Sequence, residues 1–152
     1  MGAPPTCVTD AMPEMQRNIE TLSAELRSAV GAHVPIIAIT YPDVVLGAWV
    51  YGSAGQAIAE QSLQAFRQTI NPTFKAAYAP SQVTFVDVTA ATGAYVPLTT
   101  LVTHRPYGRV PYAVSRVCTL TWFCQQQNIH PKDAGYAEIA ALVTAAYHQL
   151  VS

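Results

Sequence analysis

The residue best placed to do chemistry is His130, which precedes Pro131 just ahead of the last helical segment of the chain. Pro131 restricts the backbone, and Asp133 is positioned to cap the first turn of that helix. Because an imidazole titrates near neutral pH, a histidine held in this way can act as a general base or acid. The spacing predicts an imidazole fixed on a rigid rim at the end of a sheet. A histidine in a purely structural turn is the alternative.

Two aspartates follow apolar segments. Asp43 comes after the first predicted strand, at the end of a sheet where α/β proteins place their sites, so it could orient His130. The alternative for Asp43 is an Asx-type turn after the preceding proline. Asp87 lies inside a strand pattern, and we expect it to accept hydrogen bonds from neighbouring backbone amides.

No serine has the sequence context of an activated nucleophile. Ser53 lies in Tyr-Gly-Ser-Ala-Gly, which is not Gly-x-Ser-x-Gly and follows no predicted strand directly. We therefore expect Ser53 to occupy an ordinary loop. Ser115 is no better supported as a nucleophile.

The cysteines are Cys7, Cys118 and Cys124, without a Cys-x-x-Cys pair or a nearby histidine at zinc-finger spacing, so no metal site is expected. Cys118 and Cys124 enclose five residues, which a disulfide can close if the segment turns. Two buried thiols are the alternative. After oxidising expression we expect the bridge, with Cys7 free. This spacing, the eleven prolines and the sparse charge suggest an exported protein.

The composition excludes several classes of function. Charged residues make up 11% of the 152 residues, and the formal net charge is −1. Without a basic field, neither a nucleic acid nor an anionic membrane surface would be held. No apolar run approaches the ~20 residues of a membrane-spanning helix. The length suits a single domain over residues 1–152.

The elements that must position His130 alternate between helix and strand. This alternation predicts an α/β fold with a parallel sheet, although two strands are too few for an independent sheet. A proline at position 72 is expected to kink or split the second helix. The expected elements are a helix over 10–30, a strand over 34–41, a helix over 56–77, a strand over 83–88, a surface loop over 89–111, a short helix over 112–123 and a helix over 134–150.

The segment 128–140, Asn-Ile-His-Pro-Lys-Asp-Ala-Gly-Tyr-Ala-Glu-Ile-Ala, resembles the last block of the SGNH (GDSL) hydrolases, His-Pro-Asn-x-x-Gly-Tyr-x-x-Ile-Ala. Residues 34–43, 46–49, 52–57 and 117–124 are similar to actinobacterial, often exported, esterases of that family. The resemblance implies that His130 is the general base for a serine. It also implies that the chain is the C-terminal portion of an SGNH-like domain, with part of a three-layer, flavodoxin-like parallel sheet and flanking helices.

The chain departs from the family in two ways. The Gly-Asp-Ser block with the nucleophile and the Gly-x-Asn-Asp block of the oxyanion hole are absent. Gln127 occupies the usual aspartate position, and Lys132 replaces an asparagine. In some relatives a backbone carbonyl three residues before the histidine orients the ring, and the matching atom here is the Gln127 carbonyl oxygen.

We therefore predict a carboxylic-ester hydrolase of the Ser–His type, secreted or in the cell envelope, that acts on a small ester without a cofactor. The 152-residue chain by itself is expected to be inactive, because the serine block is missing. The alternative function is a non-catalytic α/β module. If the first part of the domain is missing, the predicted strands leave an open, apolar sheet edge near His130, through which the chain is expected to self-associate.

Overall fold

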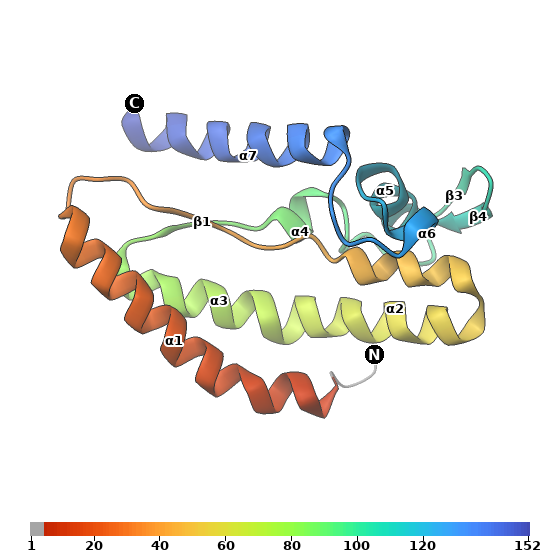
Figure 1. Ribbon diagram of the computed structural model, residues 1–152, viewed down its shortest axis with the longest axis horizontal. Helices are drawn as coiled ribbons and strands as arrows, with labels where there is room; N and C mark the ends of the chain where they lie inside the picture. The colour runs from red at the N-terminus through yellow and green to blue at the C-terminus, as the bar shows by residue number, and fades with distance from the viewer. Residues whose placement is uncertain (1–4) are drawn as a thin grey trace.

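A computed structural model describes residues 5–152 as a set of helices around two short parallel strands (Figure 1). Its first half contains α1 (Thr6–Val30), β1 (Ile37–Ile39), the 3₁₀ helix η1 (Val44–Tyr51), α2 (Ser53–Ala65), the π-helical segment η2 (Phe66–Ile70), α3 (Asn71–Tyr78) and the 3₁₀ turn η3 (Ala79–Ser81). The second half contains β2 (Thr84–Val86), α4 (Val88–Ala91), β3 (Leu101–His104), β4 (Gly108–Pro111), α5 (Tyr112–Leu120), α6 (Phe123–Gln126) and α7 (Asp133–Val151).

The two predicted parallel strands are present, but each is shorter than expected. Ile37 lies opposite Thr84, and Ile39 lies opposite Val86. The α/β class is confirmed at this level. A three-layer parallel sheet is not seen in residues 5–152, where the parallel sheet has two strands. Figure 1 places α7 on one side of these strands and α3 on the other.

The segment 89–111 is not the plain surface loop that was expected. It begins within α4 and contains an antiparallel hairpin of β3 and β4, in which Val102 lies opposite Val110. Its prolines and glycines are typical of turns, but Gly108 and Pro111 are the first and last residues of β4. Gly108 has a φ of +76°, which favours glycine at the first residue of β4.

The helix expected over 56–77 is divided just before Pro72. Its first part, α2, passes into the wide turns of η2, where the Asn71 N–H bonds to the carbonyl oxygen of Phe66, five residues earlier. Pro72 then falls in the first turn of α3, where its missing N–H costs little. The chain therefore stays helical through residue 78, with the π-helical segment η2 separating α2 from α3.

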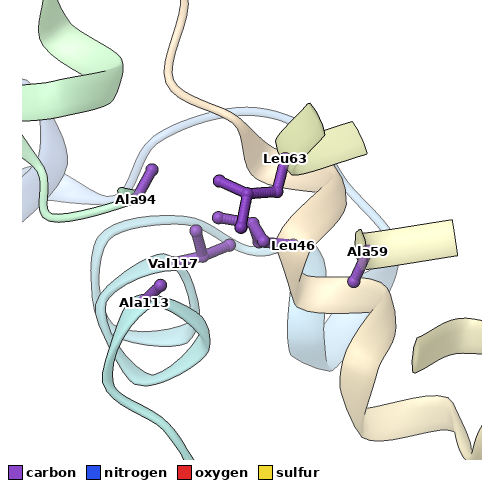
Figure 2. Packing of buried hydrophobic residues seen from close by; sticks show 6 residues of the cluster. All are labelled: Leu46, Ala59, Leu63, Ala94, Ala113 and Val117. Carbon is purple, nitrogen blue, oxygen red and sulfur yellow. The ribbon is translucent and has the colours of Figure 1, made fainter. Parts of the chain in front are cut away.

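The main apolar core lies beside the sheet, where η1, α2 and α5 meet (Figure 2). α2 can approach η1 closely because Gly55 has no side chain; a Cβ there would lie 2.0 Å from the carbonyl oxygen of Ala48. This packing fixes α5, whose far end carries the candidate site. The buried members of this cluster are Leu46, Ala59, Leu63, Ala94, Ala113 and Val117.

α1 is fastened at its C-terminal end by one side chain. The Arg27 guanidinium donates hydrogen bonds to four carbonyl oxygens, those of Gly31, Val34, Ser81 and Gln82. Leu22, on the apolar face of α1, is 62% exposed, so this face is less covered by the rest of the fold than its periodicity predicts. Over the part of the chain that the structure describes, no helix is long and apolar enough to cross a membrane.

Candidate functional site

His130 lies in the turn between α6 and α7, and its side chain is exposed. Its backbone N–H donates to the Asn128 side-chain oxygen at 2.9 Å, and its carbonyl accepts from the Trp122 N–H at 3.1 Å. The neighbouring Ile129 carbonyl accepts from the Tyr41 hydroxyl at 3.1 Å. Because Tyr41 follows β1 closely, this bond places the histidine turn beside the C-terminal end of that strand.

The residues after His130 are fixed to the C-terminal end of α5. Pro131 forms an isolated antiparallel bridge with Thr121, and the Lys132 N–H donates to the Leu120 carbonyl at 2.8 Å. The Lys132 ammonium donates to the Cys118 carbonyl at 2.8 Å and lies 4.9 Å from the centre of the Trp122 ring. Burial lowers the pKa of Lys132. A cation at this position complements the C-terminal carbonyls of α5.

The structure shows why residue 135, the first of the Gly-Tyr pair, is a glycine. A Cβ at residue 135 would lie 2.3 Å from the carbonyl oxygen of Leu120 and 2.9 Å from the Cβ of Pro131. The absence of a side chain therefore lets the first turn of α7 pack directly on the end of α5. Beside this contact is an apolar hollow, lined by Pro42, Val117, Leu120, Pro131, Gly135 and Ile139, together with two threonines.

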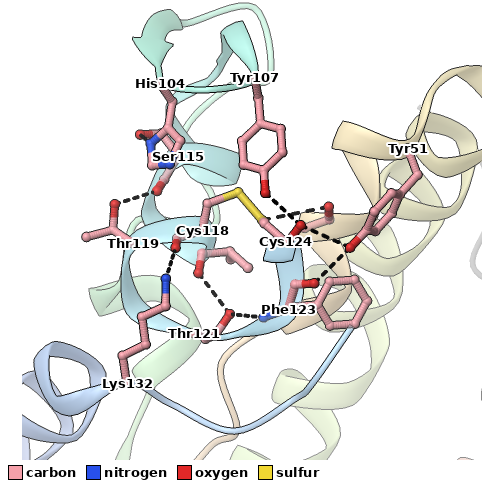
Figure 3. Close-up of a disulfide and its surroundings, with 12 residues drawn as sticks. Tyr51, His104, Tyr107, Ser115, Cys118, Thr119, Thr121, Phe123, Cys124 and Lys132 are labelled. Carbon is pink, nitrogen blue, oxygen red and sulfur yellow. Dashed lines mark hydrogen bonds between the residues drawn. A yellow bond between two sulfur atoms is a disulfide. The ribbon is translucent and has the colours of Figure 1, made fainter. Parts of the chain in front are cut away.

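The expected Cys118–Cys124 disulfide is present and joins α5 to α6 (Figure 3). Both cysteines are buried, whereas Cys7 is exposed and is the free cysteine of residues 5–152. The Cys124 carbonyl accepts two tyrosine hydroxyls, from Tyr51 at 3.1 Å and Tyr107 at 2.7 Å. The bridge and the two tyrosines hold α6, the short helix that leads into the histidine turn.

Replacing Cys118 and Cys124 together with alanine is expected to lower the free energy of unfolding by about 2 kcal/mol, because the bridge restricts the unfolded chain. Denaturant unfolding of this variant and of wild type measures the difference, and Cys7→Ala, which removes an exposed thiol, is the matched control. Alkylation of the unreduced, unfolded protein should modify Cys7 alone. Modification of all three cysteines would contradict the bridge.

The predicted partners of His130 make no hydrogen bonds with its ring in the described residues. Within residues 5–152, no hydrogen bond reaches the imidazole from the Gln127 carbonyl, from Asp43 or from Ser53. Gln127 lies at the end of α6 in the left-handed region, with a φ of 53°. Ser53 is exposed at the start of α2. The orienting roles of Gln127 and Asp43 stay predictions.

Asp43 is almost fully buried, at 1% exposure, and faces α2. One carboxylate oxygen accepts the Ser62 hydroxyl at 2.6 Å, while the second has no hydrogen-bond partner in the described residues. Burial raises the pKa of Asp43 to about 6, although the Ser62 hydrogen bond favours the ionised form. This contact, between the residue before η1 and the C-terminal part of α2, was not anticipated from the sequence.

A buried polar network lies at the C-terminal ends of β1 and β2. The Asn71 amide nitrogen is within hydrogen-bond distance of Asp87, Thr89 and the Tyr95 hydroxyl, at 3.0, 3.0 and 2.9 Å. Asp87 also accepts the Ala90 N–H at 2.8 Å, so its expected bond to a neighbouring backbone amide is present. Burial is the main cause that raises the pKa of Tyr95 to about 12, and the negative charge of Asp87 is the second cause.

A second serine–histidine contact occurs away from His130. The His104 Nδ1 lies 2.9 Å from the Ser115 hydroxyl oxygen, and the His104 ring stacks on Tyr107 (Figure 3). Ser115 lies within α5, where the backbone N–H groups are used by the helix, so no oxyanion hole adjoins it. The contact fastens the β3–β4 hairpin to α5. Sequence reasoning missed it because the hairpin was not predicted.

Residues 5–152 contain no group of three or more histidine, cysteine or acidic side chains that could hold a metal ion. Comparison with models of protein families, with curated proteins and with solved structures gave no match. Any statement of function therefore depends on the residues and geometry of the chain.

Proposed function

We propose that this chain is the base-bearing, C-terminal part of a carboxylic-ester hydrolase of the SGNH type, with His130 as the general base. In the complete enzyme a serine attacks the ester carbonyl while His130 accepts the serine proton. His130 then returns this proton to the leaving alcohol as the acyl-enzyme forms. Water completes the reaction in a second step of the same kind, without a metal ion or an organic cofactor.

The observation that carries the proposal is the way in which His130 is presented. Its ring is exposed, whereas its backbone is bonded on both sides and the following residues are fixed to α5. A general base needs this combination, because the imidazole must reach substrate while the chain that carries it stays in place. The hollow lined by Pro131 and Ile139 puts an apolar surface beside the histidine turn.

Position in the fold supports the same function. The bond from Tyr41 to Ile129 puts the histidine turn at the carboxyl end of β1, where α/β enzymes bind their substrates. We propose that β1 and β2 belong to a larger three-layer parallel sheet in the complete domain. The buried disulfide agrees with the proposed location outside the cell or in its envelope.

The second candidate function is a non-catalytic α/β module. It is favoured by the absence of any serine or carboxylate hydrogen-bonded to the His130 ring within residues 5–152. In this case the bonds around residues 128–135 serve only to join α5 to α7.

The deciding experiment is to express residues 1–152 together with the coding sequence that lies in frame upstream of Met1. We expect this sequence to encode Gly-Asp-Ser and Gly-x-Asn-Asp, and the product to hydrolyse p-nitrophenyl acetate. His130→Ala should then lower kcat by about 10⁴-fold or more. His104→Ala, which removes a half-buried imidazole far along the chain from His130, is the control and should leave kcat close to wild type. Absence of both blocks, or hydrolysis that survives His130→Ala, would favour the module.

A further inference from the structure

Trp122 lies beside His130 on the exposed side of the histidine turn. Thr121 and Pro131 form an isolated antiparallel bridge, and both line the apolar hollow. In the next pair, the Trp122 N–H donates to the His130 carbonyl oxygen at 3.1 Å. Because successive residues of a bridge point to opposite sides, Trp122 and His130 are directed away from the hollow, and both are exposed. The indole and the candidate base therefore share one surface.

The Trp122 indole is held in place but is not covered. The Lys132 ammonium lies 4.9 Å from the centre of the ring and donates to the Cys118 carbonyl at 2.8 Å (Figure 3). This contact fixes the ring, because a cation is attracted to an aromatic face. Trp122 is nevertheless 39% exposed, and within residues 5–152 its indole N–H makes no hydrogen bond. Exposed ring surface and a free donor are thus available to a ligand.

Two free amide groups lie close to this indole. Gln125 and Gln126 follow Trp122 by three and four residues, and both of their backbone N–H groups donate to the Trp122 carbonyl. Side chains at this spacing are neighbours on a helix. Both amides are exposed, and neither makes a side-chain hydrogen bond in the part of the chain that the structure describes. An amide both donates and accepts, which matches the hydroxyl groups of a ligand.

The reaction assigned to His130 decides which part of an ester meets this surface. In that reaction His130 returns a proton to the leaving alcohol, so the alcohol oxygen must come within hydrogen-bond distance of the imidazole. Groups that adjoin the imidazole on its exposed side therefore contact the alcohol part of the ester. These groups are a flat ring and free amides, because the apolar hollow lies on the other side of the bridge.

We propose that Trp122 binds the alcohol part of the substrate, and that this part is a hydroxylated ring such as a sugar. One side of the ring packs on the indole face, while its hydroxyl groups bond to the Trp122 N–H and to the amides of Gln125 and Gln126. This inference rests on the proposed function, because the bound group is the alcohol that His130 protonates. Trp122 is then a specificity-determining residue, which holds the alcohol oxygen beside the imidazole.

Two-dimensional amide NMR of the 152-residue chain tests binding without catalysis. The chain has two tryptophans, and Trp49, which packs against the apolar core, supplies the reference signal. Methyl β-glucoside should shift the Trp122 indole N–H signal, with a dissociation constant in the millimolar range, and should leave the Trp49 signal unchanged. The same concentration of n-propanol, which has no ring, should shift neither signal.

Substitution of the ring gives the matched comparison, with binding followed through the backbone amide signal of Gln126. Trp122→Leu should weaken glucoside binding about tenfold, and Trp122→Phe, which keeps a ring, should weaken it less. Tyr147→Leu removes an aromatic ring of α7 that is 49% exposed, and it should bind as wild type does. Absence of any Trp122 shift, or an equal shift with n-propanol, would overturn the proposal. Binding of benzyl alcohol but not of the glucoside would overturn the assignment of a hydroxylated ring.

The complete enzyme separates this inference from the proposed function. Trp122→Leu should raise KM about tenfold for a methyl glucoside acetylated at one hydroxyl, and should leave kcat/KM for ethyl acetate close to wild type. An equal loss with both esters would assign Trp122 a structural role only and would overturn the inference. Glucoside binding by a complete protein that hydrolyses no ester would support the Trp122 site and contradict the hydrolase function. Hydrolysis of ethyl acetate without glucoside binding would do the reverse.

Discussion

The isolated chain of 152 residues is expected to hydrolyse p-nitrophenyl acetate no faster than free imidazole at the same concentration. Its exposed imidazole can assist water weakly, but within residues 5–152 no serine hydroxyl is hydrogen-bonded to His130. Loss of the nucleophile from a serine–histidine site costs on the order of 10⁶ in turnover. A spectrophotometric assay of the purified chain and of His130→Ala measures this, and the two rates should differ by no more than the rate that one free imidazole contributes.

The serine–histidine contact in α5 provides the necessary control. A fluorophosphonate probe should label neither Ser115 nor Ser53. Ser115 lies within α5 with no oxyanion hole beside it, and within residues 5–152 no histidine is hydrogen-bonded to the Ser53 hydroxyl to activate it. Rapid hydrolysis by the isolated chain that is abolished by His130→Ala would contradict the expectation of inactivity. Hydrolysis that is abolished by Ser115→Ala or His104→Ala would move the catalytic site to the hairpin and would contradict the role proposed for His130.

The stability of the wild-type chain, compared with that of Asp43→Asn, is expected to fall as pH rises from about 4 to above 6. The folded protein raises the pKa of Asp43 from its ordinary value of 3.8 to about 6, so the folded state binds this proton more tightly than the unfolded state. The resulting stabilisation is fully present below the unfolded pKa and is lost as pH rises through the folded one. A shift of this size corresponds to about 3 kcal/mol.

Denaturant unfolding of both proteins at a series of pH values tests this effect. The Asp43→Asn substitution keeps the shape of the side chain and an oxygen for the Ser62 hydroxyl, but the new amide cannot ionise. The difference in unfolding free energy between the two proteins should therefore change in favour of the asparagine variant as pH rises. Asp10→Asn alters an exposed carboxylate of α1 and should show the wild-type dependence. Parallel pH profiles for wild type and Asp43→Asn would contradict a buried carboxyl at this position.

The sequence predicted best those features that neighbouring residues determine by themselves, such as the two parallel strands and the disulfide. The continuous β-branched run around Ile37 identified β1, and the run around Phe85 identified β2, because buried parallel strands are apolar on both faces. The disulfide could be anticipated because five residues between two cysteines allow a turn to close. The position of His130 before the last helix followed from the proline. The expected cap by Asp133 was wrong, because Asp133 is the first residue of α7, Lys132 occupies the cap position, and no side-chain capping hydrogen bond is made there.

Contacts between distant segments could not be predicted in this way. The contact of Asp43 with Ser62 depends on how tightly η1 packs on α2, which no local pattern encodes. The His104–Ser115 contact requires a hairpin whose strands are short and flanked by turn residues. The face of α1 that carries Leu22 has a helical period typical of core residues, yet burial depends on what the rest of the fold places against that face.

The four carbonyl oxygens bonded to Arg27 have a consequence for how the molecule opens. Two of them follow α1 in the chain, and the other two directly precede β2, so one side chain ties the end of the first helix to the start of a distant strand. Separation of the two segments would leave the charged Arg27 guanidinium and its carbonyl acceptors without their hydrogen bonds at the same time, which makes the step unfavourable. The C-terminal turns of α1 should therefore unfold in the same cooperative unit as β2, while the N-terminal turns open independently at lower free energy.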